Sequence, residues 1–162
     1  MNYAYILLGT NLGHKITNLN TAMDEIDNKC GKIITQSDIY ETAPWGKTEQ
    51  PSFLNMVVKI ETNCNAEVLL ERLLSIEHKM GRIRNTKWGE RILDLDILYF
   101  NNEITVKKQL KIPHPELHNR KFTLIPLCDI AADYKHPIFN ISNRQLLERC
   151  QDKCEVTRLI IS

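Results

Sequence analysis

The chain has 162 residues, of which 43% are hydrophobic and 25% are charged; 21 basic against 20 acidic residues leave a net charge of +1. This composition is typical of one globular domain over residues 1–162 and gives no general attraction to nucleic acid or membranes. The five cysteines are scattered, and no signal peptide or transmembrane run is recognisable, so we expect a cytoplasmic protein without membrane contact.

The first part of the chain alternates strand-like and helix-like segments. The run NYAYILLG predicts a buried strand, and residues 16–28 predict an amphipathic helix. KIITQSDIYET predicts a second strand, APWGKTEQP a loop and SFLNMVVKIE a third strand. Asn65 is expected to cap a helix through Met80 that Gly81 ends, and a fourth strand follows at LDLDILYF.

This order of elements predicts an α+β fold, a ferredoxin-like split βαβ sandwich with a mainly antiparallel sheet. We expect its helices on one face, leaving the other face uncovered. The rest of the chain predicts C-terminal additions: a hairpin in NNEITVKKQLKI, a helix near Phe122–Ile130, a helix from Ser142 to about Cys150 and a last strand in EVTRLII.

Two aspartates stand out in the fourth strand. Successive side chains of a strand point to opposite faces, so Asp94 and Asp96 share one face, while Leu93, Leu95 and Ile97 form the core face. The aspartates lie roughly 6.5–7 Å apart at their Cα atoms, an arrangement that suits Mg²⁺. An ordinary solvated strand face is the alternative.

A basic stretch precedes these aspartates. Arginines hold phosphate oxygens in bidentate fashion, so the stretch next to two carboxylates favours a magnesium–polyphosphate site over a solvated basic loop. Its basic residues are Lys79, Arg82, Arg84, Lys87 and Arg91, against the single acid Glu90. On the third strand, Phe53 and Asn55 share a face and suggest that a ligand binds there.

Two other sequence patterns, a possible phosphate loop and a possible metal-binding pair, are weaker evidence of a site. GTNLGHK fails the Walker A spacing, so Gly9 and Gly13 are interpreted as turn glycines. His114 and His118 have metal-ligand spacing, but Pro113 and Pro115 disfavour a helix there. His114 is therefore interpreted as a hydrogen-bonding group near phosphates.

KWGERILDLDILYF resembles the signature of the 6-hydroxymethyl-7,8-dihydropterin pyrophosphokinases. YILLGTNLG, YETAPWG with QPSFLNMVV, IEHKMGRIR, and IPHPELHNRKFTLIPLCDIA resemble further blocks of that family, in family order across residues 3–132. The chain departs from many relatives at Thr10 and Phe53, where serine and tyrosine are frequent, and at Gln109, Lys111 and Pro115 near the nucleotide.

The resemblance implies transfer of pyrophosphate from ATP to the hydroxymethyl group of a reduced pterin in folate biosynthesis, with release of AMP. It implies ATP and 6-hydroxymethyl-7,8-dihydropterin as the small-molecule substrates and two Mg²⁺ ions. We expect a monomer without a nucleic-acid partner.

The resemblance also implies the site residues. The implied catalytic residues are Arg82, Arg91, Asp94 and Asp96, of which the aspartates hold the Mg²⁺ ions. The implied nucleotide contacts are Glu77, Arg84, Trp88, Ile97, His114 and Arg120, with Trp88 in a loop that closes over the site. The implied pterin pocket consists of Thr42, Pro44, Trp45, Phe53, Asn55 and Phe122.

Two other functions are compatible with parts of the pattern. A nucleotidyl- or glycosyltransferase could use the same pair of aspartates, and it would give a nucleotidyl or sugar product instead of AMP. A ferredoxin-like RNA-binding module would need strand aromatics among basic residues, and Asp94 and Asp96 would repel an RNA backbone.

Overall fold

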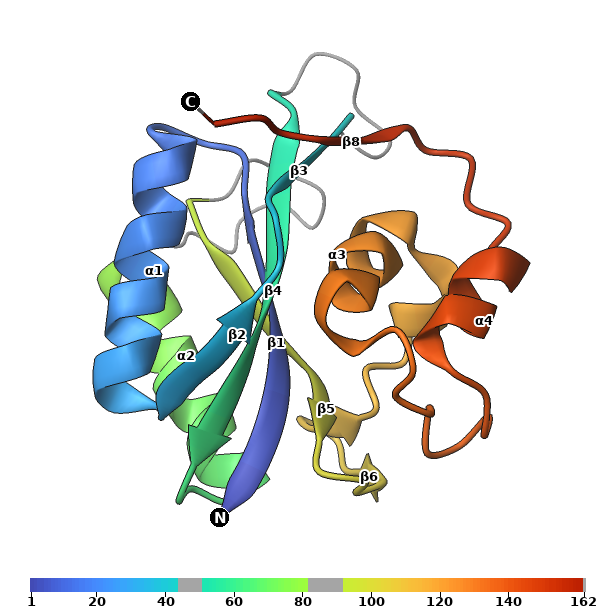
Figure 1. Ribbon diagram of the computed structural model, residues 1–162. Helices are drawn as coiled ribbons and strands as arrows, with labels where there is room; N and C mark the ends of the chain where they lie inside the picture. The colour runs from blue at the N-terminus through green and yellow to red at the C-terminus, as the bar shows by residue number, and fades with distance from the viewer. Residues whose placement is uncertain (44–50, 82–91, 162) are drawn as a thin grey trace.

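The computed structural model describes residues 1–43, 51–81 and 92–161. Helices α1 (Lys15–Lys29) and α2 (Ala66–Lys79) lie on one side of a central sheet, and α3 (Lys121–Ala131) and α4 (Asn143–Arg149) lie on the other (Figure 1). The short 3-10 helix Leu117–Asn119 leads into α3. None of the described helices is long and apolar enough to cross a lipid bilayer.

The central sheet has the order β5, β1, β4, β3, β8, and β2 also pairs with β4. Every pairing among the described strands is antiparallel. The strands are β1 (Asn2–Thr10), β2 (Lys32–Gln36), β3 (Tyr40–Thr42), β4 (Phe53–Thr62), β5 (Asp94–Phe100) and β8 (Val156–Arg158). This order confirms the ferredoxin-like arrangement. Strands β6 (Thr105–Val106) and β7 (Lys111–Ile112) form the predicted hairpin.

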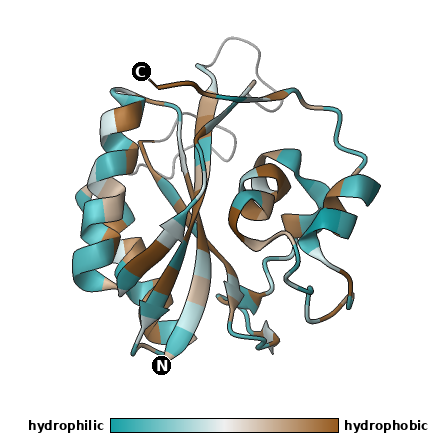
Figure 2. Ribbon diagram, viewed as in Figure 1, coloured by the Kyte–Doolittle hydropathy of each residue, from teal (hydrophilic) through white to brown (hydrophobic). Residues whose placement is uncertain are grey.

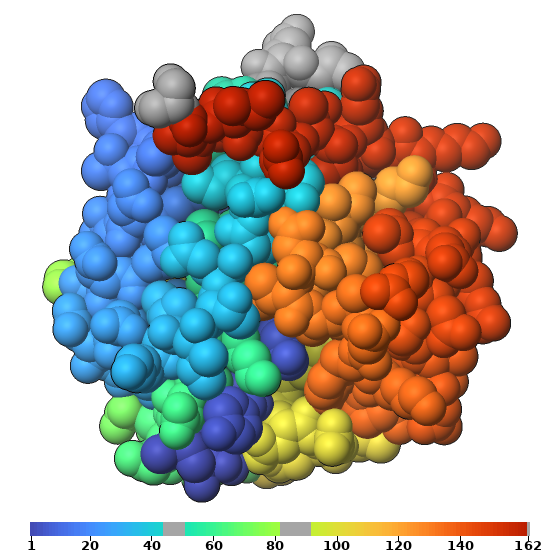
Figure 3. Space-filling view, viewed as in Figure 1, coloured from blue at the N-terminus to red at the C-terminus, as the bar shows by residue number. Residues whose placement is uncertain are grey.

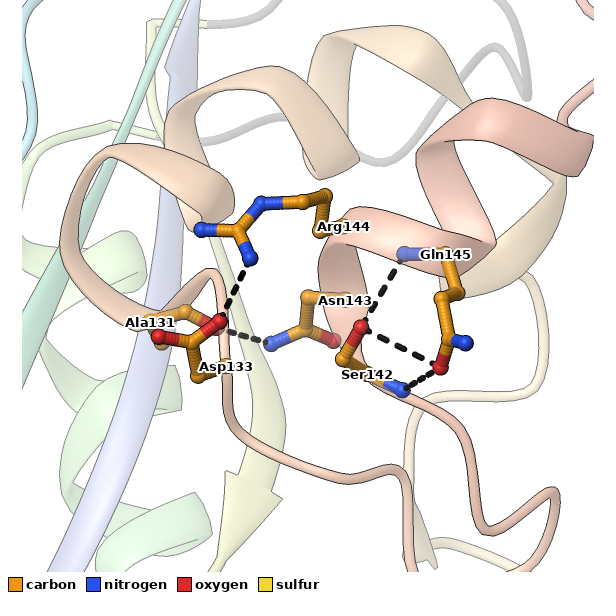
Figure 4. Close-up of polar contacts among 6 residues, drawn as sticks. All are labelled: Ala131, Asp133, Ser142, Asn143, Arg144 and Gln145. Atoms are coloured by element: carbon orange, nitrogen blue, oxygen red, sulfur yellow. Dashed lines mark hydrogen bonds and ion pairs between the residues drawn. The ribbon is translucent and has the colours of Figure 1, made fainter.

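Local sequence signals set the helix ends as predicted. Asn65 Oδ1 accepts the N–H of Val68 at 2.9 Å and caps α2. After α2, Gly81 has a φ of 85°, a conformation that glycine adopts at low cost. Ser142 and Gln145 form a capping box at the start of α4 (Figure 4).

Two apolar clusters stabilise the sheet, one on each face. The cluster under α1 and α2 contains the alternate residues of β4 from Leu54 to Ile60 and Leu93, Leu95 and Ile97, as predicted. The second cluster joins β1, β4 and β5 to α3 and α4. In Figure 2 the strands carry much of the brown, apolar colouring, whereas α1 and α4 are largely teal.

The expectation that one sheet face would be uncovered is wrong. Leu124 and Leu127 of α3 and Leu146 of α4 are buried in the second cluster. Tyr5, Leu7 and Val57 already make this face apolar by ordinary strand alternation, and an irregularity in β5 adds to it, because the register with β1 shifts between Tyr5 and Ile6. Both Leu98 and Tyr99 therefore face α3, and this extra apolar surface needs a cover.

The predicted second strand is divided into β2 and β3. Between them the Ser37 hydroxyl accepts the N–H of Val57 at 2.9 Å, in place of a main-chain carbonyl. A serine that bonds to the main chain interrupts a ladder in this way. Strand β8 then pairs with β3, and the C-terminal residues run across one end of the molecule, red in Figure 3.

Candidate active site

One level of the sheet brings two predicted site residues, Asp94 and Asn55, into a row. Asp94 on β5 pairs with Gly9 on β1, Gly9 pairs with Asn55 on β4, and Asn55 pairs with Tyr40 on β3. Residues directly opposite each other share a face, which here is the α3 face. Strands lie about 4.8 Å apart, so Asp94 and Asn55 are about 10 Å apart at their Cα atoms.

Because Gly9 has no side chain, its main chain is uncovered between the side chains of Asp94 and Asn55. A Cβ at this position would lie 2.7 Å from Asn55 Oδ1, so no other residue fits without moving Asn55. Gly9 lies within β1 and is not a turn residue, which corrects the interpretation from sequence, whereas Gly13 has the positive φ of a turn glycine, 74°.

Asp94 and Asp96 are both half-buried on this face. Between them, the N–H of Leu95 donates to Glu77 Oε2 at 2.7 Å, and Glu77 is only 2% exposed. The Glu77 carboxylate, implied in nucleotide binding, therefore holds the main chain of the aspartate strand. The Ile97 side chain lies in the core under α1 and α2, so only its main chain can contact a ligand.

His114 lies at the outer edge of β5, where its N–H donates to the Leu98 carbonyl at 3.0 Å. Burial lowers the pKa of His114 to about 4, helped by the positive charge of Arg120, while Glu116 and Asp94 oppose the shift. The Glu116 N–H donates to Nδ1 at 3.1 Å. The neutral imidazole thus carries its proton on Nε2, where it can donate to a phosphate oxygen.

The start of α3 contributes a cation and a ring. The Arg120 guanidinium lies 5.6 Å from the centroid of the Phe122 ring. Phe122 packs against the cluster on the α3 face, the face that carries Asp94 and Asn55. The Lys121 N–H donates to Asp152 Oδ2 at 3.1 Å, so the C-terminal segment caps this helix.

The predicted pterin-side residues gather on β3 and β4. Thr42 pairs directly with Phe53, and Asn55 lies two residues further along the same face. Thr42 is 4% exposed, and among the described residues its hydroxyl has no hydrogen-bond partner. A ring, an amide and a hydroxyl side by side suit a flat heterocycle with donors and acceptors on its edge.

The described carboxylates fit a magnesium–nucleotide site. Among residues 1–43, 51–81 and 92–161, no three His, Cys, Asp or Glu side chains gather as a metal cage. Mg²⁺ commonly uses one or two carboxylates together with substrate phosphates, and Asp94 and Asp96 meet that need.

Part of the predicted site lies outside the described residues, namely Pro44, Trp45, Arg82, Arg84, Trp88 and Arg91. The first basic residue of that stretch, Lys79, binds Glu25 of α1 at 2.8 Å, on the side of the sheet that α1 and α2 cover. Lys79 is therefore not part of the row.

The turn after β1 has a role that its sequence did not reveal. Lys15 Nζ donates to the Ser52 carbonyl at 3.1 Å, and the Asn11 amide donates to the Pro51 carbonyl at 3.4 Å. Asn18 contacts the carbonyls of Leu12 at 2.8 Å and Ile92 at 3.5 Å. The turn thus braces the starts of β4 and β5, the two strands that carry Asn55 and Asp94.

Comparisons with known proteins identify the family of the chain. The family model of 7,8-dihydro-6-hydroxymethylpterin-pyrophosphokinase (HPPK) matches residues 5–132. A 2-amino-4-hydroxy-6-hydroxymethyldihydropteridine pyrophosphokinase of Haemophilus influenzae is 43% identical over 135 residues, 83% of this chain and 84% of the relative. A protein of the same name from Bacillus subtilis is 45% identical over 131 residues, 80% of this chain and 78% of the relative.

Solved structures share the fold. The crystal structure of Plasmodium falciparum HPPK-DHPS wild type with SDX-DHP has a TM-score of 0.74 and 22% identity. The match covers 92% of this chain and 43% of that one, so the chain spans less than half of the solved protein. It likewise spans 20% of a folic acid synthesis protein of Pneumocystis carinii that is 37% identical over 148 residues, which cover 91% of this chain.

Proposed function

Because the chain belongs to the 7,8-dihydro-6-hydroxymethylpterin-pyrophosphokinase family, we propose that its row from Asp94 to Asn55 is the site of that family's reaction. The enzyme transfers pyrophosphate from ATP to 6-hydroxymethyl-7,8-dihydropterin in folate biosynthesis and releases AMP. The observation that carries the proposal is the row itself: two carboxylates at one end, a ring and an amide at the other, and the bare main chain of Gly9 between them.

The phosphate side lies along β5. Asp94 and Asp96 would hold two Mg²⁺ ions, which when bound neutralise the phosphate charge and activate the attacking hydroxyl. His114 Nε2–H and Arg120 donate to phosphate oxygens, and the main chain of Ile97 contacts the nucleotide. Glu77 supports this side through Leu95. Arg82, Arg84, Trp88 and Arg91 complete the ATP contacts by resemblance to the family.

The pterin side lies on β3, β4 and the start of α3. The Asn55 amide offers a donor and an acceptor to the pterin edge, and Phe53 and Phe122 stack on the ring. The Thr42 hydroxyl, which has no hydrogen-bond partner among the described residues, provides a further polar contact. Pro44 and Trp45 join this pocket by resemblance to the family.

The hydroxymethyl oxygen of the pterin attacks the β-phosphorus of ATP in line, the bond to the α-phosphate oxygen breaks, and AMP leaves. The lowered pKa of His114, about 4, makes its imidazole a poor base at neutral pH. We therefore assign the rate enhancement to positioning and charge neutralisation rather than to a side-chain base. The protein acts in the cytoplasm as a monomer, without nucleic acid.

The test is an assay with ATP, Mg²⁺ and 6-hydroxymethyl-7,8-dihydropterin. AMP and the pterin diphosphate should form in equal amounts, and AMP should not form when the pterin is omitted. A nucleotidyltransferase would instead release pyrophosphate and attach AMP to the acceptor. Release of pyrophosphate or ADP, or formation of AMP without pterin, would overturn the proposal.

A further inference from the structure

One carboxylate of α3 binds the start of β3. The Tyr40 hydroxyl donates to the Asp129 carboxylate, with distances of 2.9 Å to Oδ1 and 2.8 Å to Oδ2. The N–H of Asp38 donates to Asp129 Oδ2 at 3.1 Å. Tyr40 is 7% exposed whereas Asp129 is exposed, so the donor side of this hydrogen bond is buried, and the charge of its acceptor strengthens it.

Both β3 and α3 carry residues of the proposed pterin side of the site. On β3, Tyr40 pairs with Asn55, and Thr42 follows two residues later on the same face. On α3, Asp129 comes seven residues after Phe122, which is about two helical turns, so both lie on the same side of the helix. The bond thus joins the strand beside Asn55 to the helix that carries Phe122.

The donor role of Tyr40 does not change with pH in the working range. Burial, and next the bond to Asp129, raise the pKa of the Tyr40 phenol well above its usual value. The hydroxyl therefore stays protonated and keeps Asp129 as its acceptor at neutral pH.

We propose that Tyr40 and Asp129 are positioning residues for the pterin site. Together they fix the gap between Phe122 on α3 and the wall formed by Phe53 and Asn55 on β4. They act through those side chains and do not contact the pterin. This inference rests on the proposed function of the row.

The direct test is Tyr40→Phe, which removes only the hydroxyl and keeps the ring beside Asn55. We expect the dissociation constant for 6-hydroxymethyl-7,8-dihydropterin to rise about tenfold, the size expected for one bond to a charged acceptor. The constant for a non-hydrolysable ATP analogue with Mg²⁺ should stay within about twofold. Calorimetric titration with each ligand separately measures both.

Tyr99→Phe is the matched control. The Tyr99 hydroxyl donates to Asn143 Oδ1 of α4 at 2.6 Å, and Tyr99 is fully buried on the same sheet face. The same atom is removed, but this bond holds α4 and reaches α3 only indirectly, through the Asn143 amide that donates to the Ala131 carbonyl at the end of α3 opposite Phe122. The Tyr99→Phe variant should lose stability in a thermal melt and bind the pterin as the wild type does.

A double-mutant cycle tests whether the pair acts as a unit. Asp129→Ala should weaken pterin binding, and adding Tyr40→Phe should weaken it no further. If Tyr40→Phe does not fold, Asp129→Asn provides a milder variant, with a smaller selective loss expected because the acceptor loses its charge.

The possible results distinguish the positioning inference from the proposed function. Selective loss of pterin affinity in Tyr40→Phe, without loss in Tyr99→Phe, supports the inference. Unchanged pterin affinity in Tyr40→Phe, equal losses for pterin and ATP analogue, or equal losses in both tyrosine variants would overturn it while leaving the proposed function intact. A wild-type protein that binds no pterin would overturn the proposed function, and the inference with it.

Discussion

At the scale of single residues, the site depends on which face of a strand each side chain occupies. Asp94 and Asp96 face α3 because β5 pairs with β1 in a register that places them opposite Gly9 and Leu7. Their neighbour Leu95 faces the other way, into the core. Polar substitutions of the two aspartates should therefore change the chemistry while leaving the apolar clusters in place.

We expect Asp94→Asn and Asp96→Asn each to lower the rate of AMP formation about 10²–10³-fold, because each removes a preorganised charge at the phosphates. Their far-UV circular dichroism should match the wild type. Glu103→Gln, at an exposed acid beyond the end of β5, is the control. Near wild-type turnover of either aspartate variant at saturating Mg²⁺ would contradict the metal assignment.

Substitution of Asn55 should weaken the binding of one substrate only. Asn55→Ala removes both the donor and the acceptor that we propose bind the pterin edge, and we expect pterin binding to weaken about tenfold or more. ATP-analogue binding should change little, because Asn55 lies two strands away from Asp94. Separate calorimetric titrations measure each; equal losses would mean that Asn55 supports the fold instead of binding the pterin.

His114 should contribute to the pH dependence of stability. Its pKa is about 4 in the folded protein against an ordinary 6.5, so between these values the unfolded chain binds the extra proton. Stability should therefore fall as the pH drops from about 6.5 towards about 4. His136, whose pKa is also lowered to about 4 by burial, acts in the same direction.

Urea unfolding at about pH 7 and about pH 5 tests this effect. The His114→Gln variant should lose less stability over this interval than the wild type, because one of the two proton-binding differences is gone. His14→Gln, at an exposed position before α1, controls for the substitution itself. An identical loss in His114→Gln and the wild type would contradict the prediction.

At the scale of elements, α3 is held at both ends by residues from distant parts of the chain. Tyr40 binds Asp129 near its C-terminal end, and Asp152 accepts the N–H of Lys121 at its first residue. At the C-terminal end of α3, Asn143 Nδ2 donates to the Ala131 carbonyl at 2.8 Å. Just beyond that end, Arg144 binds Asp133 at 2.7 Å (Figure 4). The helix that carries Phe122 is thus fixed along its length.

The cap from Asp152 should be measurable. Partial burial would raise the pKa of Asp152, but the N–H groups of Cys154 and Lys121 donate to its carboxylate and lower it overall. Asp152→Ala should cost about 1 kcal/mol of stability, as lost helix caps do, and Asp152→Asn less, because the amide oxygen still accepts. Amide exchange of residues 121–124 should speed up in Asp152→Ala; unchanged exchange there would contradict the cap.

At the scale of the whole molecule, β1, β4 and β5 contribute to both apolar clusters. If the helices on one face came away, the apolar side chains of these shared strands would be exposed to water, and the other cluster would lose support. We therefore propose that residues 1–162 form one domain.

The expected result is a single unfolding transition in urea, with the same midpoint by far-UV and near-UV circular dichroism. Tyr5→Ala in the second cluster and Met56→Ala in the first should both shift that common midpoint. Two separate midpoints in the wild type, or a shift in one signal alone, would indicate two independently folding parts.

The sequence by itself predicted most of the helices and strands, and it suggested the chemistry of the site. Periodicity, capping at Asn65 and Ser142, and Gly81 predicted the helices and their ends, because these signals act between residues near in the chain. Strand alternation placed Asp94 with Asp96 and Phe53 with Asn55. Motif resemblance supplied the family, which periodicity alone could not.

Only the tertiary structure decided what depends on register and on contacts between distant segments. Helices α3 and α4 covered a face expected to be open, and the irregularity in β5 turned both Leu98 and Tyr99 towards that cover. Cross-strand pairing placed Gly9 between Asp94 and Asn55. Packing of the helices on the sheet formed the hydrogen bonds from Leu95 to Glu77 and from Tyr40 to Asp129. Partners 18 and 89 residues apart leave no local pattern, because the physical cause of their meeting is the folded sheet.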